Sequence, residues 1–185
     1  MRLFVALTPS PDVQRAVWEA FAPLRARPMP VKWVPPENVH LTLKFLGEVA
    51  AGRQDEIIGA LASAVQGART ITLVVRGAGA FPNERTPRVI WAGIEPDPAI
   101  EILADRLERS CATLGFPTEG RAFRPHLTLG RAERATRARD WVGVAELLDE
   151  LHVDASTMLD GVDLVRSELR RGGSVYHRVH RERLS

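Results

Sequence analysis

Apolar positions follow two different periods along this chain, and together they predict a mixture of strands and helices. Short apolar or β-branched runs predict strands at residues 2–7, 31–34, 39–46, 71–75, 88–94, 123–129, 159–169 and 174–179. Helical spacing of apolar residues predicts helices from Pro11 to the Pro23 region and at residues 54–66, 99–114 and 139–151. Residues 77–86 have the composition of a loop. The element order of the second half echoes that of the first, which predicts an α+β fold.

One tetrapeptide occurs twice. His40-Leu41-Thr42-Leu43 and His126-Leu127-Thr128-Leu129 are identical and 86 positions apart, close to half of the 185 residues. A repeat at that distance indicates two similar lobes rather than a short-period solenoid. No stretch between them has the glycine and serine content of a flexible linker. We therefore expect residues 1–185 to form a single bilobal domain, with one motif in each lobe.

Strand geometry assigns the residues of each motif to two faces. Side chains alternate along a strand, so the histidine and threonine of each copy share one face and the two leucines occupy the other. Burying the leucines fixes the register, because a one-residue slip would bury the polar pair. Strict alternation also places Lys44 on the histidine face, Phe45 on the leucine face and Arg131 on the face opposite His126.

Two facing histidines indicate acid and base chemistry at phosphorus. In-line displacement needs a base for the entering oxygen and an acid for the leaving oxygen. Histidine suits both roles, because its unperturbed pKa of about 6.5 lets both protonation states exist near neutrality. Threonine hydroxyls can donate to the non-bridging phosphate oxygens. The symmetry of the two motifs leaves open which histidine is the acid.

Composition narrows the alternatives. Of 25 basic residues, 23 are arginine, a side chain that binds phosphate in a bidentate manner, although a general preference for arginine explains the excess equally well. The lone Cys111 excludes an internal disulfide and a cysteine-based zinc site, and we expect it in the core. The chain shows no signal peptide and no apolar run long enough to span a membrane. We expect a cytoplasmic protein without membrane association.

Two absences concern cofactors. Neither Lys32 nor Lys44 lies in the K-x-D-G context of an adenylating ligase, and the sequence has no phosphate-binding G-x-x-x-x-G-K-[ST] loop. His177 and His180 are three apart on a predicted strand and so point to opposite faces, and His152 has no ligand pattern around it. We predict no metal and no cofactor. Four aromatic residues are candidates for stacking a base: Phe45, Trp33, Phe81 and Tyr176. For Phe45, strand alternation favours a place in the core.

The motifs resemble those of a known family. The paired H-x-T-x sequences resemble the 2H phosphoesterases, and among these the bacterial and archaeal RNA 2',3'-cyclic phosphodiesterases once called 2'-5' RNA ligases. The resemblance extends over residues 2–6, 33–48, 79–82, 88–91, 124–131, 164–167 and Tyr176. It implies two pseudo-symmetric antiparallel sheets with flanking helices and a central cleft.

The resemblance also implies roles for individual residues. His40 would be the proton donor to the leaving 3' oxygen and His126 the proton acceptor that activates water, producing a 2'-phosphate. Thr42 and Thr128 would hold the phosphate, and Arg131 would assist. Arg131 reaches the histidine face only if the strand has a bulge or an end at Gly130.

These inferences predict a phosphodiesterase independent of metal and ATP. Its partners would be RNA with 2',3'-cyclic phosphate ends or cyclic nucleotides, and we expect a monomer. Two alternatives stay open: ATP-independent 2'-5' RNA ligation by the reverse chemistry, and a non-catalytic module that binds RNA or nucleotides.

Overall fold

The computed structural model describes residues 1–171 and 173–185. Its strands are β1 (Arg2–Leu7), β2 (Val31–Trp33), β3 (Leu41–Glu48), β4 (Ile71–Phe81), β5 (Val89–Ile94), β6 (His126–Ala132), β7 (Asp154–Leu159), β8 (Gly161–Arg170) and β9 (Gly173–Arg183). Its α-helices are α1 (Pro11–Ala20), α2 (Ala22–Arg25), α3 (Gln54–Val65), α4 (Pro98–Thr113) and α5 (Val144–Glu150). Short 3₁₀ helices are η1 (Pro36–Asn38), η2 (Ala51–Arg53) and η3 (Ala138–Trp141).

The strands form a curled sheet made of two halves. Its order is β7-β4-β5-β6-β3-β1-β8-β9, with β2 also paired to β6. We call β3, β1, β8 and β9 the β3 lobe, and β6, β5, β4, β7 and β2 the β6 lobe. Between the lobes, β3 and β6 pair at the single position Leu41–Leu127. The predicted bilobal α+β fold is confirmed, and its two sheets are joined edge to edge.

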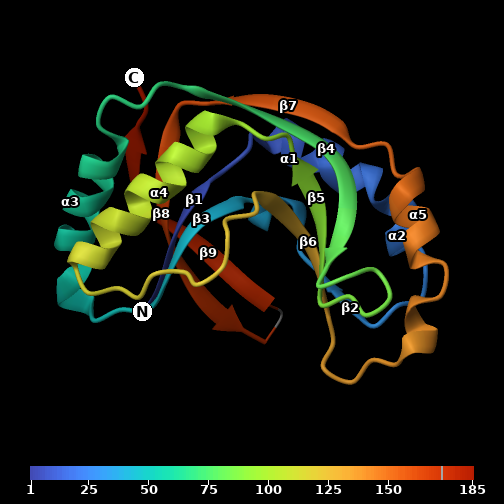
Figure 1. Ribbon diagram of the computed structural model, residues 1–185. Helices are drawn as coiled ribbons and strands as arrows, with labels where there is room; N and C mark the ends of the chain where they lie inside the picture. Colours follow the sequence, from blue (N-terminus) through green and yellow to red (C-terminus); the bar gives the residue numbers. More distant parts are fainter. Residues whose placement is uncertain (172) are drawn as a thin grey trace.

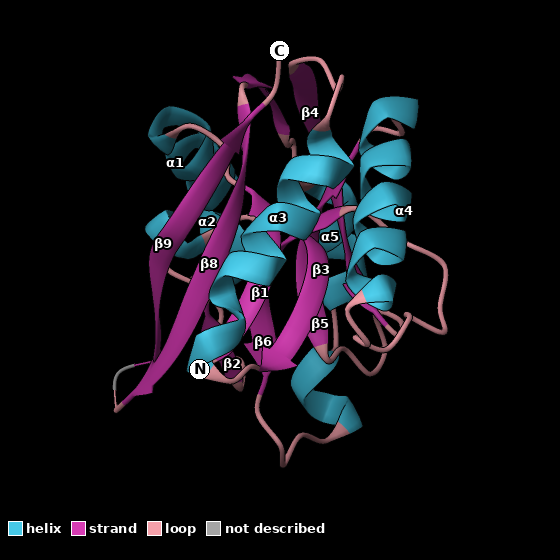
Figure 2. Ribbon diagram, turned by 90° about the vertical axis from the view of Figure 1, so that its left-hand side faces the viewer, coloured by secondary structure: helices cyan, strands magenta, loops and turns pink. Residues whose placement is uncertain are grey.

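The lobes are not the two halves of the sequence. β8 from the end of the chain pairs with β1, while β4 from the first half pairs with β5 and β7. Helices α3 and α4 pack together on the β3 lobe, and α1, α2 and α5 lie on the β6 lobe (Figures 1 and 2). The helix that follows β1 and the helix that follows β5 therefore each cover the opposite lobe.

The two faces of the sheet have different environments. The four motif leucines, Leu41, Leu43, Leu127 and Leu129, are buried in one core with residues of the helices. The opposite face carries a small separate cluster of Phe4, Ala6 and Val165 with Tyr176 packed against it. We call this second face the histidine face. Burial of the leucines thus presents the polar residues of each motif, as alternation predicts.

Several element boundaries differ from the sequence predictions, among them the start of β6, which is His126 rather than residue 123. The predicted helix at 139–151 is divided into η3 and α5 at Gly143, which has a left-handed φ of 76°. β4 continues to Phe81 through the predicted loop, because Gly79 lets the ring of Trp91 lie on the strand: an added Cβ would be 2.4 Å from Trp91 Cζ2. β7 was not predicted, since this edge strand is mostly exposed and lacks an apolar run.

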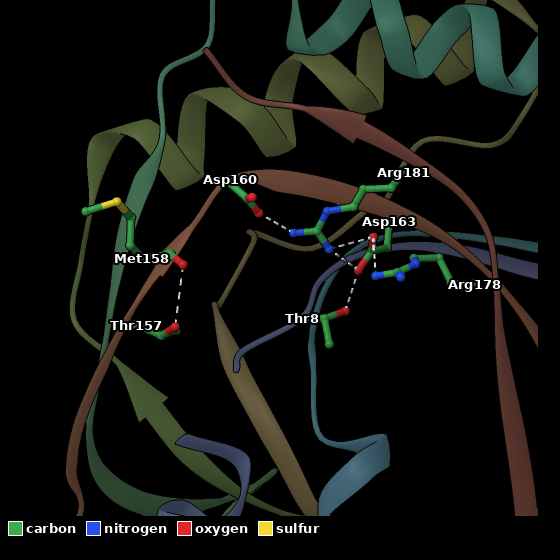
Figure 3. A network of polar contacts seen from close by, with 7 residues as sticks. All are labelled: Thr8, Thr157, Met158, Asp160, Asp163, Arg178 and Arg181. Carbon is green, nitrogen blue, oxygen red and sulfur yellow. Dashed lines mark hydrogen bonds and ion pairs between the residues drawn. The ribbon is translucent and has the colours of Figure 1, made fainter. Parts of the chain in front are cut away.

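A buried carboxylate ties the β3 lobe together on the histidine face. Asp163 of β8 is 1% exposed. It accepts hydrogen bonds from the Thr8 hydroxyl at 2.7 Å and from Arg181 of β9 at 3.1 and 3.3 Å (Figure 3). Arg178 lies 3.8 Å away, and Arg181 also pairs with Asp160. These bonds fix the end of β1 against the β8–β9 hairpin.

Within the described residues, no helix is both long enough and apolar enough to cross a membrane.

Candidate active site

His40 is held by a hydrogen bond to the backbone just before β3 and by contacts with two aromatic rings. Its Nδ1–H donates to the carbonyl oxygen of Asn38 at 2.7 Å, and its Nε2 lies 3.1 Å from the Thr42 hydroxyl. Because a carbonyl can only accept, Nδ1 carries the proton and Nε2 of the neutral ring is the acceptor. Phe4 stacks on the imidazole at 4.7 Å, and Tyr176 contacts it edge-on at 5.2 Å.

His126 has an equivalent arrangement in the other lobe. Its Nδ1–H donates at 2.6 Å to the carbonyl oxygen of Arg124, again two residues earlier. Phe81 of β4 contacts the ring edge-on at 5.0 Å. In both lobes a local backbone bond therefore fixes the ring and leaves Nε2 for chemistry.

A bulge follows each histidine at the same distance. In β3, Thr42 pairs with Ala6 but Lys44 pairs with Val5, so Leu43 is an extra residue. In β6, Thr128 pairs with Trp91 but Gly130 pairs with Ile90, so Leu129 is extra. A bulge shifts the alternation of every residue after it.

These bulges change the faces predicted beyond the motifs. Phe45, predicted on the leucine face, is 52% exposed and lies with its ring 6.2 Å from that of Phe4 on the histidine face. Arg131 occupies the matching position in β6, and its charge acts on both histidines. Arg131 could reach the histidine face only through a bulge or a strand end near Gly130, and the bulge lies one residue earlier, at Leu129. Strict alternation was wrong for both residues because it assumed an unbroken strand.

Lys44 was also predicted on the histidine face, and that prediction is wrong. Its side chain is buried on the helix side, where Nζ bonds both oxygens of Glu108 in α4, at 2.9 and 2.8 Å. The ammonium also donates to the carbonyl oxygen of Pro117 at 2.7 Å. Glu108 further accepts the backbone N–H of Glu119 at 2.6 Å. Lys44 thus fastens β3 to α4 and does not reach the site.

Burial dominates the electrostatics of the two histidines. Burial lowers the pKa of His40 to about 4, the bond to Asn38 opposes this, and the charges of Arg131 and His126 lower it further. Burial also lowers the pKa of His126, against the bond to Arg124 and with a contribution from Arg131. Both rings are therefore neutral at pH 7 in the free protein, and an anion between them would favour protonation.

Aromatic residues wall each histidine. Phe4 and Tyr176 do so in the β3 lobe, and Phe81, with Trp91 behind it at 5.1 Å, in the β6 lobe. A pocket of about 310 Å³ beside His126 is lined in part by Phe81, Trp91, Phe123 and Arg124. Trp33 does not join these walls, because its ring lies over Gly130 on the core side. Sequence reasoning missed Phe4, since all of 3–7 is apolar and buried and alternation gives no face.

The two histidines of β9 each contact a carboxylate. His180 contacts Glu182 at 2.9 Å and His177 contacts Glu168 at 3.4 Å, each beside a carboxylate. The described residues contain no group of three or more histidine, cysteine or acidic side chains placed to hold a metal ion. Cys111 is buried in α4, as predicted.

Two structurally equivalent H-x-T-x strands, one per lobe of a curled sheet, define a phosphoesterase of the two-histidine class. The family model described as "LigT like Phosphoesterase" matches residues 7–91 and 94–176. The chain belongs to this family, which confirms the resemblance seen in the sequence.

Curated relatives carry a more specific name. A protein of Methanothermobacter thermautotrophicus called RNA 2',3'-cyclic phosphodiesterase is 36% identical over 178 residues, which cover 95% of each chain. A protein of Thermus thermophilus with the same name is 34% identical over 95% of this chain and 86% of its own.

Solved structures are similar over the whole chain. The protein TT0787 of Thermus thermophilus superposes with a TM-score of 0.80 at 30% identity, covering 100% of this chain and 98% of its own. LigT of E. coli, in complex with 3'-AMP, gives a TM-score of 0.79 at 27% identity with the same coverage.

Proposed function

We propose that this protein hydrolyses the terminal 2',3'-cyclic phosphate of RNA to a 2'-phosphate, with no metal and no ATP. The observation that carries the proposal is the pair of equivalent histidines, each anchored through Nδ1 to a carbonyl two residues earlier. Such anchoring leaves two Nε2 atoms to transfer protons on one face of the sheet. The name shared by curated relatives supports the same substrate class. We further propose a cytoplasmic monomer.

The proposed reaction is an in-line displacement. Nε2 of His126 accepts a proton from water as its oxygen bonds to phosphorus. The bond from phosphorus to the 3' oxygen breaks, and Nε2 of His40 gives its proton to that oxygen. The product carries a 2'-phosphate and a 3'-hydroxyl. Thr42, Thr128 and Arg131 would bind the non-bridging oxygens and offset the charge that develops there.

Because the pKa of His40 is low, this residue becomes a proton donor only when the substrate is bound. A neutral His40 has no proton to give through Nε2, since its ring proton is on Nδ1. An anionic phosphate beside the ring favours the imidazolium and so raises the pKa of His40 in the complex. His126 has to be neutral in the same complex to act as the base, as it is in the free protein, where burial lowers its pKa.

The decisive test is hydrolysis of a nucleoside 2',3'-cyclic phosphate and of a cyclic-phosphate-ended oligonucleotide in EDTA. We expect ³¹P NMR to show the 2'-phosphate as product. His40→Ala and His126→Ala should each reduce kcat by about 10²- to 10⁴-fold, the usual worth of one acid or base. The rate should be bell-shaped in pH, because one histidine must be protonated and the other neutral.

The matched control is His152→Ala, at an exposed position between α5 and β7, which should keep wild-type activity. Full activity in the His40→Ala, His126→Ala double variant would overturn the proposal. A flat profile from about pH 5 to 9 would contradict the two-histidine mechanism.

A further inference from the structure

Two cations lie side by side where β2 meets β6. Lys32 of β2 is the register partner of Arg131 of β6, and both side chains are exposed. Register partners on antiparallel strands point to the same face, with Cβ atoms about 5 Å apart. Lys32 and Arg131 are therefore direct neighbours on one surface.

That surface is the histidine face. A Cβ on Gly130, the neighbour of Arg131, would lie 2.7 Å from the side chain of Val31 and 3.0 Å from that of Trp33. Both of these residues pack against the main core. Lys32, between them in β2, points to the opposite side, which it shares with Arg131.

This pair lacks compensating charge. Among the described residues, neither Lys32 nor Arg131 forms an ion pair, whereas Lys44 is fully paired with Glu108. Like charges directly opposite on neighbouring strands destabilise a sheet. The arrangement becomes favourable when an anion lies over both cations.

The β8–β9 hairpin borders Lys32 on its other side. A Cβ on Gly173 of β9 would be 3.6 Å from Lys32 Cε and 3.7 Å from its Nζ. Asn38, whose carbonyl anchors His40, donates through Nδ2 to the carbonyl oxygen of Ser174 at 2.8 Å. The ammonium of Lys32 thus lies between Arg131 and the hairpin, at the edge of the candidate active site.

We propose that Lys32, next to the Arg131 that contacts the reacting phosphate in the proposed reaction, forms a subsite for a second phosphate, the one on the 5' side of the terminal nucleotide. This inference rests on the proposed function. A 3'-terminal cyclic phosphate has further phosphates only upstream, so an anion bound beside the reacting group belongs to the preceding linkage. The substrate class is then an RNA end, or a nucleoside cyclic phosphate that also carries a 5'-phosphate, in preference to one with a 5'-hydroxyl.

The test compares a nucleoside 2',3'-cyclic phosphate with and without a 5'-phosphate. We measure kcat/KM for both compounds and take their ratio. Lys32→Ala should lower the preference for the 5'-phosphorylated compound by about tenfold, the worth of one charge-assisted hydrogen bond. Lys32→Arg should retain it. With an oligonucleotide, log kcat/KM falls as log salt rises, and Lys32→Ala should make this negative slope shallower by about 0.7, as for one lost contact to a single strand.

The control is Arg69→Ala, which removes one exposed cation between α3 and β4 and should leave the ratio unchanged. If wild type hydrolyses both compounds but Lys32→Ala leaves their ratio unchanged, or lowers both rates equally, the subsite is overturned while the proposed function stands. If wild type hydrolyses neither of these compounds nor the oligonucleotide, the proposed function fails and this inference fails with it.

Discussion

At the scale of single residues, the same local hydrogen bond orients both histidines. Each donates its Nδ1–H to a carbonyl two residues earlier, so the tautomer is set by the backbone just before the motif. Their surroundings differ. His40 is stacked on Phe4 and edged by Tyr176, and burial lowers the pKa of its imidazole to about 4. Desolvation, rather than the identical tetrapeptide, distinguishes the two rings.

The lowered pKa of His40 predicts that the free energy of unfolding depends on pH. Its pKa is 6.5 in the unfolded reference and about 4 in the fold, so between these values the unfolded chain binds more protons. The free energy of unfolding should therefore fall as pH drops from 6.5 to 4, by on the order of 3 kcal/mol for this group. His126, with its pKa also lowered, adds loss of the same sign.

Urea unfolding at several pH values checks this prediction. His40→Phe keeps an aromatic ring against Phe4 but cannot titrate, so its curve should be flatter between pH 4 and 6.5. His152→Gln, at an exposed position, should keep the wild-type dependence. An unchanged pH dependence in His40→Phe would refute the assignment.

At the scale of elements, the bulges decide what surrounds each histidine. In each strand the extra residue is the third after the histidine, Leu43 or Leu129. The bulge places the fifth residue after the histidine on the histidine face. That position is Phe45 in the β3 lobe and Arg131 in the β6 lobe. The fold is pseudo-symmetric, yet one lobe presents an apolar ring and the other a cation, so the two sides of the site differ in chemistry.

The bulge in β3 also turns Lys44 toward α4, and its ion pair should contribute to stability. Lys44→Met would leave Glu108 without its cation and the Pro117 carbonyl without a donor. We expect a loss of about 3 kcal/mol, the lower end of the range for breaking a buried pair, because Glu108 is partly exposed. Chemical denaturation of the variant measures this loss.

The double variant Lys44→Met, Glu108→Gln separates charge from packing. A glutamine at 108 can still accept from the Glu119 N–H and has no charge to leave unpaired. Most of the lost stability should return. If the double variant is as unstable as Lys44→Met, the effect comes from packing and the electrostatic explanation is wrong.

At the scale of the whole molecule, one core spans both lobes. Leucines of both motifs belong to a single buried cluster with residues of α1, α3, α4 and α5. Strands from the two ends of the chain, β1 and β8, lie side by side in the sheet. Neither lobe is a continuous piece of sequence, so neither has a core of its own to keep when the other unfolds.

We therefore predict one cooperative unfolding transition. All four tryptophans, Trp18, Trp33, Trp91 and Trp141, lie in β2, β5 or the helical elements on the β6 lobe. Their fluorescence reports that lobe, while far-UV circular dichroism reports both. The two melting curves should coincide, and calorimetric and van't Hoff enthalpies should agree. Separate transitions would show that the lobes unfold independently.

The periodicity of the whole sequence determined the α+β class, and the repeated tetrapeptide determined the two lobes and the face that the histidines share, because leucine burial fixes the register of a strand. The tetrapeptide did not determine what lies beyond its four residues. The bulges at Leu43 and Leu129, the burial of Lys44 and the exposure of Phe45 follow from pairing with β1 and β5, which are distant in sequence. Likewise, only the curled sheet brings Phe4 onto His40 and Lys32 beside Arg131. Alternation is a local property of one strand, whereas register shifts and desolvation depend on its neighbours, which the tertiary structure alone supplies.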